Sequence, residues 1–224
     1  MKMAVATGID YGQLDRGALT RKFQRAAADL MPAIWKQAEH EEKFYVVGSG
    51  YDFEEFAAAV ASQISANQLA GVACIWTSLK RYPFHNGDRS FAIQQQMVEP
   101  LDGKPIVLFC QSIIADRFEV LTSLLSILDG KEAHRIVLVS FLISKGVEAE
   151  LKEALRSYAP FPVESLSIEV SPQPVEGVRD TVESSLDDRE ERYAPLMSEW
   201  LMTRKFGPKP NPSPKRSSAP TPLG

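Results

Sequence analysis

The residues with the clearest potential for chemistry lie in one polar connection, residues 80–89. It holds three cations and a histidine within ten positions: Lys80, Arg81, Arg89 and His85. Lysine and arginine bind phosphate through charge-assisted hydrogen bonds, and a nearby histidine could act as an acid or base. One interpretation is a loop that closes over a phosphorylated ligand, with His85 as the catalytic residue and the three cations as ligand-binding residues. The other is a solvated loop with an incidental histidine.

A second candidate is the turn Gly48-Ser49-Gly50, which leaves a short apolar segment and enters a helical one. Glycines at such a turn let backbone N–H groups meet an anion at the start of a helix. The turn matches neither the GxGxxG fingerprint nor a P-loop. The alternative is that Asp52 caps the helix, with Glu55 completing a capping-box pair. Acidic residues so close to the turn would repel an anion, which weakens the phosphate interpretation.

A third candidate follows the apolar segment 104–110, where Gln111 and Ser112 begin a short loop. In α/β proteins, ligands usually bind at the carboxyl end of such a strand, so both residues are predicted to bind a ligand. Asp116 is expected to cap the helix after this loop. No His, Cys, Asp or Glu cluster has metal-ligand spacing and no nucleophile motif occurs, so no metal site is predicted and the cofactor is unknown.

These candidates belong to a pattern of alternating strands and helices. Near-continuous apolar segments are separated by helical segments of 10 to 15 residues, which predicts an α/β fold. We expect a mainly parallel, doubly wound sheet of about five strands with helices on both faces. The predicted strands lie within residues 43–50, 71–79, 104–110, 134–144 and 163–170.

Composition divides the chain into four parts. Residues 1–42 are predicted to be an amino-terminal helical extension, in which Pro32 should kink or split the helix. Residues 43–170 are the α/β domain. Residues 171–206 form a carboxy-terminal amphipathic helical extension. Residues 207–224 are a Pro-rich tail, which we expect to be disordered because it cannot bury enough apolar area.

The carboxy-terminal extension holds an apolar cluster with helical spacing. This helix is interpreted as docking on its own domain. The alternative is that residues 188–205 bind a partner protein or form a homodimer. The cluster comprises Tyr193, Leu196, Met197, Trp200 and Leu201.

The bulk composition excludes several classes of protein. A net charge of −4, with scattered basic residues, argues against a nucleic-acid surface. No apolar run approaches the roughly 20 residues that span a bilayer, and no secretory signal is recognisable. Cys74 and Cys110 lie in apolar segments without metal-type spacing. We expect them to be reduced core residues of a cytoplasmic protein.

The order of these pieces resembles the type I phosphoribosyltransferase superfamily. The resemblance covers residues 43–170 and implies a phosphoribosyltransferase-like fold. Residues 43–64 resemble the first strand, pyrophosphate loop and helix, and residues 71–97 resemble the second strand and flexible loop. Residues 104–128 fall where the signature motif lies, and residues 135–155 and 163–170 resemble the next unit and the closing strand.

The signature of that family is four apolar residues, two adjacent acids and a loop rich in Thr and Gly. The resemblance implies that the acids would hold ribose hydroxyls, that the loop would hold the 5-phosphate of phosphoribosyl pyrophosphate, and that Mg²⁺ would bridge ribose and pyrophosphate. Residues 106–109 keep the apolar part, but Cys110 and Gln111 replace the acids, and the loop 112–117 has no glycine. This divergence argues against ordinary phosphoribosyl transfer.

Two functions from different classes follow. One is a divergent phosphoribosyltransferase-like protein that binds a nucleotide or sugar-phosphate ligand, with altered glycosyltransferase chemistry. It would use Gly48, Ser49, Gly50, Gln111, Ser112 and the loop 80–89. The other is a non-catalytic regulatory or assembly protein that binds a partner protein. A different doubly wound fold, flavodoxin-like or Rossmann-like, is the third interpretation.

Overall fold

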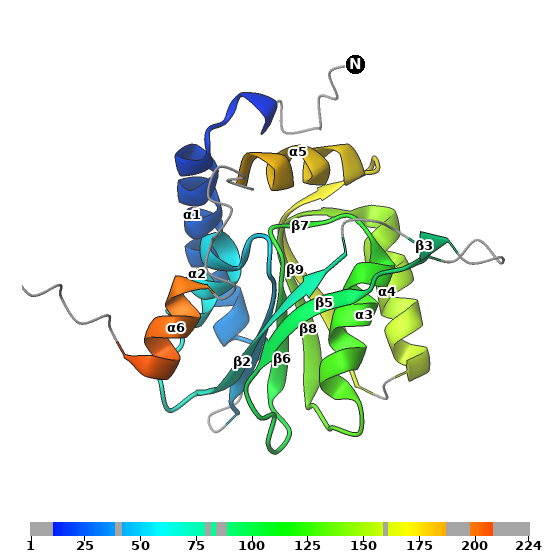
Figure 1. The fold of residues 1–224 in the computed structure, drawn as a ribbon. Coiled ribbons are helices and arrows are strands. Elements are labelled where there is room, and N and C mark those ends of the chain that lie inside the picture. Colours follow the sequence, from blue (N-terminus) through cyan, green and yellow to red (C-terminus); the bar gives the residue numbers. More distant parts are fainter. Residues whose placement is uncertain are drawn as a thin grey trace, which may run out of the picture.

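A seven-stranded sheet with helices on both faces forms the centre of the structure (Figure 1). The structure is a computed structural model that describes residues 11–38, 42–78, 82–83, 89–158, 161–186 and 198–207. Residues 82–83, 89–90 and 157–158 are described by their backbone alone. Within the described residues, no helix has the length and apolar character needed to span a membrane.

Five parallel strands make up most of the sheet, as the sequence predicted, in the spatial order β2-β1-β6-β8-β9. Their bounds are β1 (Phe44–Ser49), β2 (Leu69–Thr77), β6 (Ile106–Cys110), β8 (Arg135–Ser144) and β9 (Val163–Ser171). Every residue of β1 and β6 is buried, which explains their continuous apolar sequence.

Two further strands join this sheet. Strand β5 (Ile93–Val98) pairs antiparallel with β2, and the two-residue β7 (Ile113–Ile114) pairs with β8 beyond the end of β6. Strands β3 (Tyr82–Pro83) and β4 (Arg89–Ser90) form a separate antiparallel pair. The connection after β2 therefore contains an edge strand of the main sheet.

One face of the sheet is covered by α1 (Arg16–Trp35), by the single π-helical segment η2 (Phe53–Ala57) and by α2 (Ala58–Ala61). Asp15 caps α1, since its Oδ1 accepts a hydrogen bond of 2.7 Å from the Ala18 N–H. The predicted split of this helix at Pro32 is wrong, because α1 continues to Trp35. Pro32 lies in the last turn, where its missing N–H removes only the one hydrogen bond to the Ala28 carbonyl, and the helix continues for three more residues.

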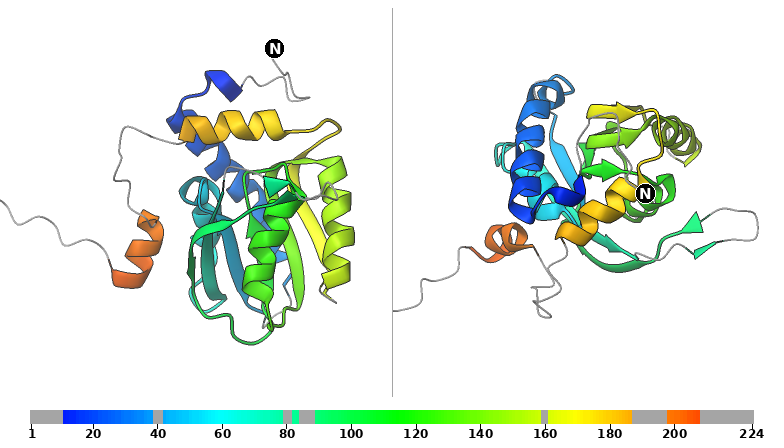
Figure 2. Two further views of the ribbon diagram at one scale, coloured as in Figure 1. Left: turned by 45° about the vertical axis from the view of Figure 1, so that its right-hand side comes forward. Right: turned by 90° about the horizontal axis from the view of Figure 1, so that it is seen from above.

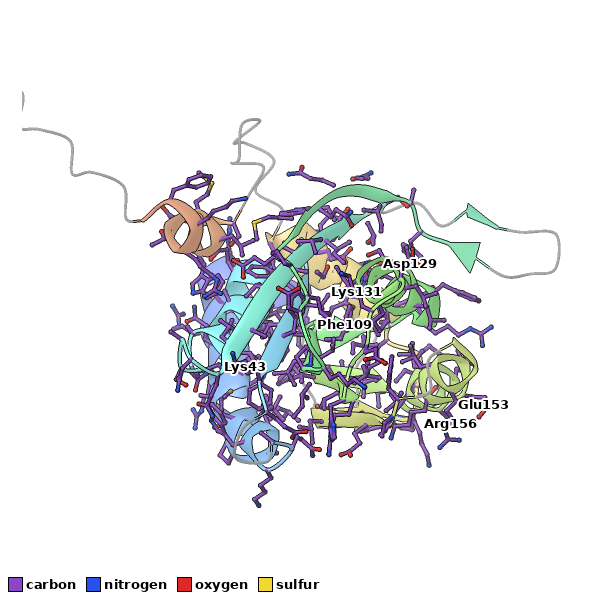
Figure 3. The ribbon with its side chains drawn as sticks, turned by 90° about the horizontal axis from the view of Figure 1, so that it is seen from below. Lys43, Phe109, Asp129, Lys131, Glu153 and Arg156 are labelled. Atoms are coloured by element: carbon purple, nitrogen blue, oxygen red, sulfur yellow. The ribbon has the colours of Figure 1, made fainter. Side chains whose placement is uncertain are left out.

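The other face is covered by α3 (Arg117–Leu128) and α4 (Lys145–Tyr158). Asp116 caps α3 as predicted, because its Oδ1 accepts a hydrogen bond of 2.8 Å from the Phe118 N–H. Figure 3 views the amino-terminal ends of the strands. In it Phe109 of β6 lies inside the molecule, whereas Glu153 and Arg156 of α4 lie at its outer side.

Helix α5 (Glu176–Leu186) crosses the opposite end of the sheet, above the carboxyl ends of β1 and β6, and contacts the short helix η1 (Tyr11–Gln13) (Figures 1 and 2). Its apolar side chains enter the same core cluster as α1. The sequence did not predict this helix as a separate element. The structure therefore covers both faces of the sheet and also one of its ends.

Helix α6 (Glu199–Phe206) contains part of the predicted amphipathic cluster. Leu201 is fully buried, and the ring of Trp200 lies 6.2 Å from that of Phe53. Arg204 holds Glu99 through both of its carboxylate oxygens at 3.0 Å. These eight residues dock on their own domain. The other members of the cluster, Tyr193, Leu196 and Met197, lie outside the described residues.

Both cysteines are buried strand residues with free thiols, as predicted: Cys74 in β2 and Cys110 in β6. Burial raises the pKa of each thiol, so neither is a reactive thiolate at neutral pH.

Candidate functional site

The carboxyl ends of β1 and β6 flank the topological switch point of the sheet, where the connections after neighbouring strands leave toward opposite faces. The chain leaves β1 toward the face covered by α1 and leaves β6 toward the face covered by α3. Doubly wound folds usually bind ligands in this crevice. The structure brings the two predicted groups together here, since Gly48 pairs in register with Cys110 beside Gln111 and Ser112.

The two glycines of the turn make room for the protein's own side chains. A Cβ on Gly48 would lie 2.5 Å from the Ala57 Cβ, and a Cβ on Gly50 would lie 2.4 Å from the Trp76 ring. The Gly50 N–H also donates a hydrogen bond to the Ile75 carbonyl at 2.8 Å. Packing within the chain thus explains a turn that the sequence linked to an anion.

Asp52 joins the turn after β1 to the loop after β6. Its Oδ2 accepts a hydrogen bond of 2.6 Å from the Ser112 N–H, and its side chain makes no helix-cap bond. The predicted capping role of Asp52 is therefore wrong, because its carboxylate reaches across the switch point instead. Burial raises the pKa of Asp52 to about 7, although the hydrogen bonds with Ser112 lower it.

A buried ion pair between Arg179 of α5 and Glu119 of α3 lies at the same end of the sheet. Nη1 of Arg179 is 2.6 Å from Glu119 Oε2, and Nη2 is 2.9 Å from Oε1. Nε of Arg179 binds Glu183 at 2.6 Å. Burial alone would lower the pKa of Arg179, but Glu119 and Glu183 raise it, so the guanidinium stays charged.

Glu119 also accepts hydrogen bonds from the sheet. The Thr77 hydroxyl donates to its Oε1 at 2.8 Å, and the Gln111 side-chain amide donates to its Oε2 at 3.2 Å. We call the set Glu119, Arg179, Glu183, Thr77 and Gln111 the Glu119 network.

A small hollow remains between α5 and the strand ends. It has room for about one water molecule. Two polar atoms of its lining, Asp52 Oδ1 and Gln111 Oε1, are buried and have no hydrogen-bond partner within the described part of the chain. The same is true of Ser49 Oγ at the end of β1. The hollow is lined by Tyr51, Asp52, Gln111, Ser112, Ile113, Arg179, Val182, Glu183 and Leu186.

Three backbone donors at this end of the sheet are already engaged. The Gly50 N–H is bonded to Ile75, the Gln111 N–H to the Val139 carbonyl at 3.1 Å, and the Ser112 N–H to Asp52. A phosphate site needs several N–H groups that converge on one anion. The arrangement therefore suits a ligand that donates hydrogen bonds better than an anion.

The loop predicted to close over a ligand is described only in part. Lys80, Arg81 and His85 lie outside the described residues, and Arg89 is described only by its backbone in β4. Their predicted binding and catalytic roles stay predictions. Among the residues that the structure does describe, no group of three His, Cys, Asp or Glu side chains could hold a metal ion.

The sequence analysis did not identify Arg179 as a residue of this site, although its guanidinium lines the hollow at the carboxyl end of the sheet. A signal was present, since Arg179 falls within a stripe of apolar residues with helical spacing. A cation on such a stripe indicates a buried anionic partner, because unpaired buried charge is costly. The stripe consists of Val175, Val178, Val182 and Leu186, which are all buried.

Comparisons with known proteins find similarity in fold alone. No protein-family model and no curated protein matches the sequence. The AQ2163 protein from Aquifex aeolicus has a similar structure, with a TM-score of 0.53, 13% sequence identity and coverage of 71% of this chain and 78% of that chain. An adenine phosphoribosyltransferase from Leishmania donovani has a TM-score of 0.46 at 13% identity, over 68% of each chain.

The observed order of the elements is the one that the sequence resemblance implied. A strand, a glycine turn and a helix come first, followed by the second strand and its long connection. The strand and helix at the position of the family signature come next, and two more strands close the sheet. The chain has a phosphoribosyltransferase-like α/β fold. Because the sequence identities are only 13%, this similarity shows the fold of the chain and does not assign it an activity.

Proposed function

We propose that this chain is a non-catalytic phosphoribosyltransferase-like protein that acts in regulation or assembly by binding a partner protein. The proposal rests on one observation. The Arg179–Glu119 ion pair and α5 fill the position at the ends of β1 and β6 where a doubly wound fold would hold its ligand.

Three further features support the loss of phosphoribosyl transfer. Cys110 is fully buried and uncharged, so it supplies no negative charge that could hold ribose hydroxyls or Mg²⁺. The Gln111 amide is committed to Glu119, and the Ser112 N–H is committed to Asp52. A sugar phosphate would have to displace α5 and bind among carboxylates, which electrostatics disfavours.

A second candidate function is binding of a small ligand at the switch point. It is favoured by the unpartnered Ser49 Oγ, Asp52 Oδ1 and Gln111 Oε1, because buried polar atoms normally have partners. The hydroxyls of a sugar phosphate or the amino group of a nucleobase could donate to these atoms. This function requires α5 to move, since the hollow as it stands has room for about one water molecule.

Thermal unfolding with added ligands separates the two candidates. A ligand present at about 100 times its Kd adds roughly 2.7 kcal/mol to stability. For the non-catalytic protein we expect no shift of Tm with phosphoribosyl pyrophosphate and Mg²⁺, nucleoside monophosphates or free bases, and no release of pyrophosphate. A Tm shift that is lost in Gln111→Ala would favour ligand binding, and pyrophosphate release would overturn the proposal.

The positive arm of the test is a partner that binds the purified chain. Candidates captured from cells should be purified and titrated against the wild-type protein by calorimetry. A measurable Kd that does not change with phosphoribosyl pyrophosphate is the expected result. If phosphoribosyl pyrophosphate competes with that partner, the chain still binds this ligand, which would contradict the proposal.

A further inference from the structure

Strand β9 is an edge of the sheet with its outer side unpaired within the described residues. It pairs in parallel with β8 along its whole length, from Val163 opposite Ile136 to Ser171 opposite Ser144. The right-hand view of Figure 2 shows β9 at the margin of the sheet between α1 and α4. The outer N–H and C=O groups of such a strand are a template for another strand.

This edge lacks most of the features that prevent pairing, and its two glutamates are the exception. Native edge strands are protected by lysine, proline, bulges or short length. Strand β9 has nine residues, an unbroken register with β8, and neither proline nor a cation. Its charged residues are Glu164 and Glu169.

Two exposed apolar side chains lie on one face of this edge. Ile168 is 45% exposed and Val170 is 44% exposed, and alternation along a strand places both on the face of Leu166. Leu166 packs against the core cluster that contains α1. The exposed pair therefore extends the apolar surface of that core to the margin of the sheet.

We infer that β9 is an interface between two copies of this chain, paired antiparallel about a two-fold axis at Ser167. Ser167 is the central residue of β9, so this register pairs the whole strand. It would place Leu166 opposite Ile168 of the partner subunit and Glu164 opposite Val170 of the partner subunit. Glu169 would face Ser165 of the partner subunit, so no carboxylate of one β9 would face a carboxylate of the other β9.

The charge pattern of the strand supports a second copy as the occupant. Both glutamates lie away from the axis on opposite sides of Ser167, and antiparallel pairing separates each from its own counterpart. The chain's own segment 208–224 is a poor alternative, because its frequent prolines cannot donate ladder hydrogen bonds. The dimer interface is independent of whether the switch point binds a ligand.

Sedimentation equilibrium of the full chain tests the interface. We expect the wild-type protein to have the mass of two chains, and Ile168→Lys or Val170→Lys to raise the dimer Kd at least about tenfold. Val98→Lys is the matched control, because Val98 is 42% exposed at the other edge strand, β5. A monomeric wild-type protein, or a dimer that both β9 variants leave intact, would overturn the inference.

Cysteine cross-linking tests the register even if a lysine variant fails to fold. Cys74 and Cys110 are buried, so a cysteine introduced at an edge position supplies the accessible thiol. Ser167→Cys should form a disulfide-linked dimer under mild oxidation because it would face its own counterpart. Ser165→Cys would face Glu169 of the partner subunit and should not. Equal cross-linking by the two variants would contradict this register.

Discussion

Arg179 and Glu119 hold each other through two contacts at the carboxyl end of the sheet, 2.6 Å from Nη1 to Oε2 and 2.9 Å from Nη2 to Oε1. Arg179 is 4% exposed and Glu119 is 2% exposed. Removing two charges from water is costly, so the net stability that such a pair adds is small. Removing one partner is strongly destabilising, because the other charge stays buried.

The first prediction concerns this ion pair. Arg179→Met should lower the free energy of unfolding by about 3–5 kcal/mol, since Glu119 would stay buried without its cation. Urea unfolding monitored by circular dichroism measures the change. Arg204→Met is the matched control, because its pair with Glu99 is partly exposed, and it should cost about 1 kcal/mol or less.

A double variant separates loss of the ion pair from loss of α5 packing. Arg179→Met combined with Glu119→Gln leaves no uncompensated charge between these two positions, and Gln can still hydrogen-bond Thr77. We expect the double variant to recover a large part of the stability lost in Arg179→Met. If the two effects simply add, the cost does not come from an unpaired Glu119.

The second prediction concerns pH. The pKa of Asp52 is about 7 in the folded state and 3.8 in its ordinary state. Between these values the folded protein binds more protons than the unfolded chain, so Asp52 lowers stability as pH rises from about 4 to 7. Asp52→Asn, which can still accept the Ser112 hydrogen bond, should flatten this part of the stability profile.

The pH experiment compares urea midpoints at several pH values. Asp29→Asn is the control, because Asp29 is exposed on α1. Its pH profile should follow that of the wild-type protein. A wild-type profile with the same slope as Asp52→Asn between about pH 4 and 7 would rule out a raised pKa for Asp52.

The third prediction concerns the glycine turn. Gly48→Ala places a Cβ 2.5 Å from the Ala57 Cβ, which belongs to a rigid backbone, so it should cost about 1–3 kcal/mol. Gly146→Ala in α4 meets no atom within 4 Å and should stabilise the protein by up to about 1 kcal/mol. Thermal unfolding of both variants checks the contrast, and a neutral Gly48→Ala would speak against packing as the reason for this glycine.

The fourth prediction concerns the missing acid pair. Cys110→Asp would place a carboxylate at a fully buried position in the core, so it should cost about 3–5 kcal/mol at neutral pH. Cys110→Ser introduces a polar group without charge and should cost about 1–3 kcal/mol. Equal stability of the two variants in urea would mean that the Asp side chain finds solvent or a cation.

The strands and most helices could be predicted from the sequence because their signals are local. Burial on both faces requires the continuous apolar runs of β1 and β6, and Asp116 capping follows from one short pattern. Parallel topology also predicts that Gly50 and Gln111 lie close together, since the carboxyl ends of β1 and β6 meet at one end of the sheet.

The closure of the site could not be predicted in the same way. It depends on Arg179 meeting Glu119, which lies 60 positions earlier in the chain. Asp52 and Ser112 are also 60 positions apart. The local sequence around Asp52 therefore indicated a helix cap and gave no sign of its actual partner. Local patterns describe the elements, whereas this end of the sheet is defined by contacts between elements.

The late position of α5 has a consequence for synthesis of the protein. Glu119 precedes Arg179 by 60 residues, and at a translation rate of about 5–20 residues per second this corresponds to roughly 3–12 s. During that interval a nascent chain on the ribosome can assemble the first strands while Glu119 has no cation. The final native contacts at this end form only after Leu186 has emerged, so until then the growing chain leaves this end of the core uncovered.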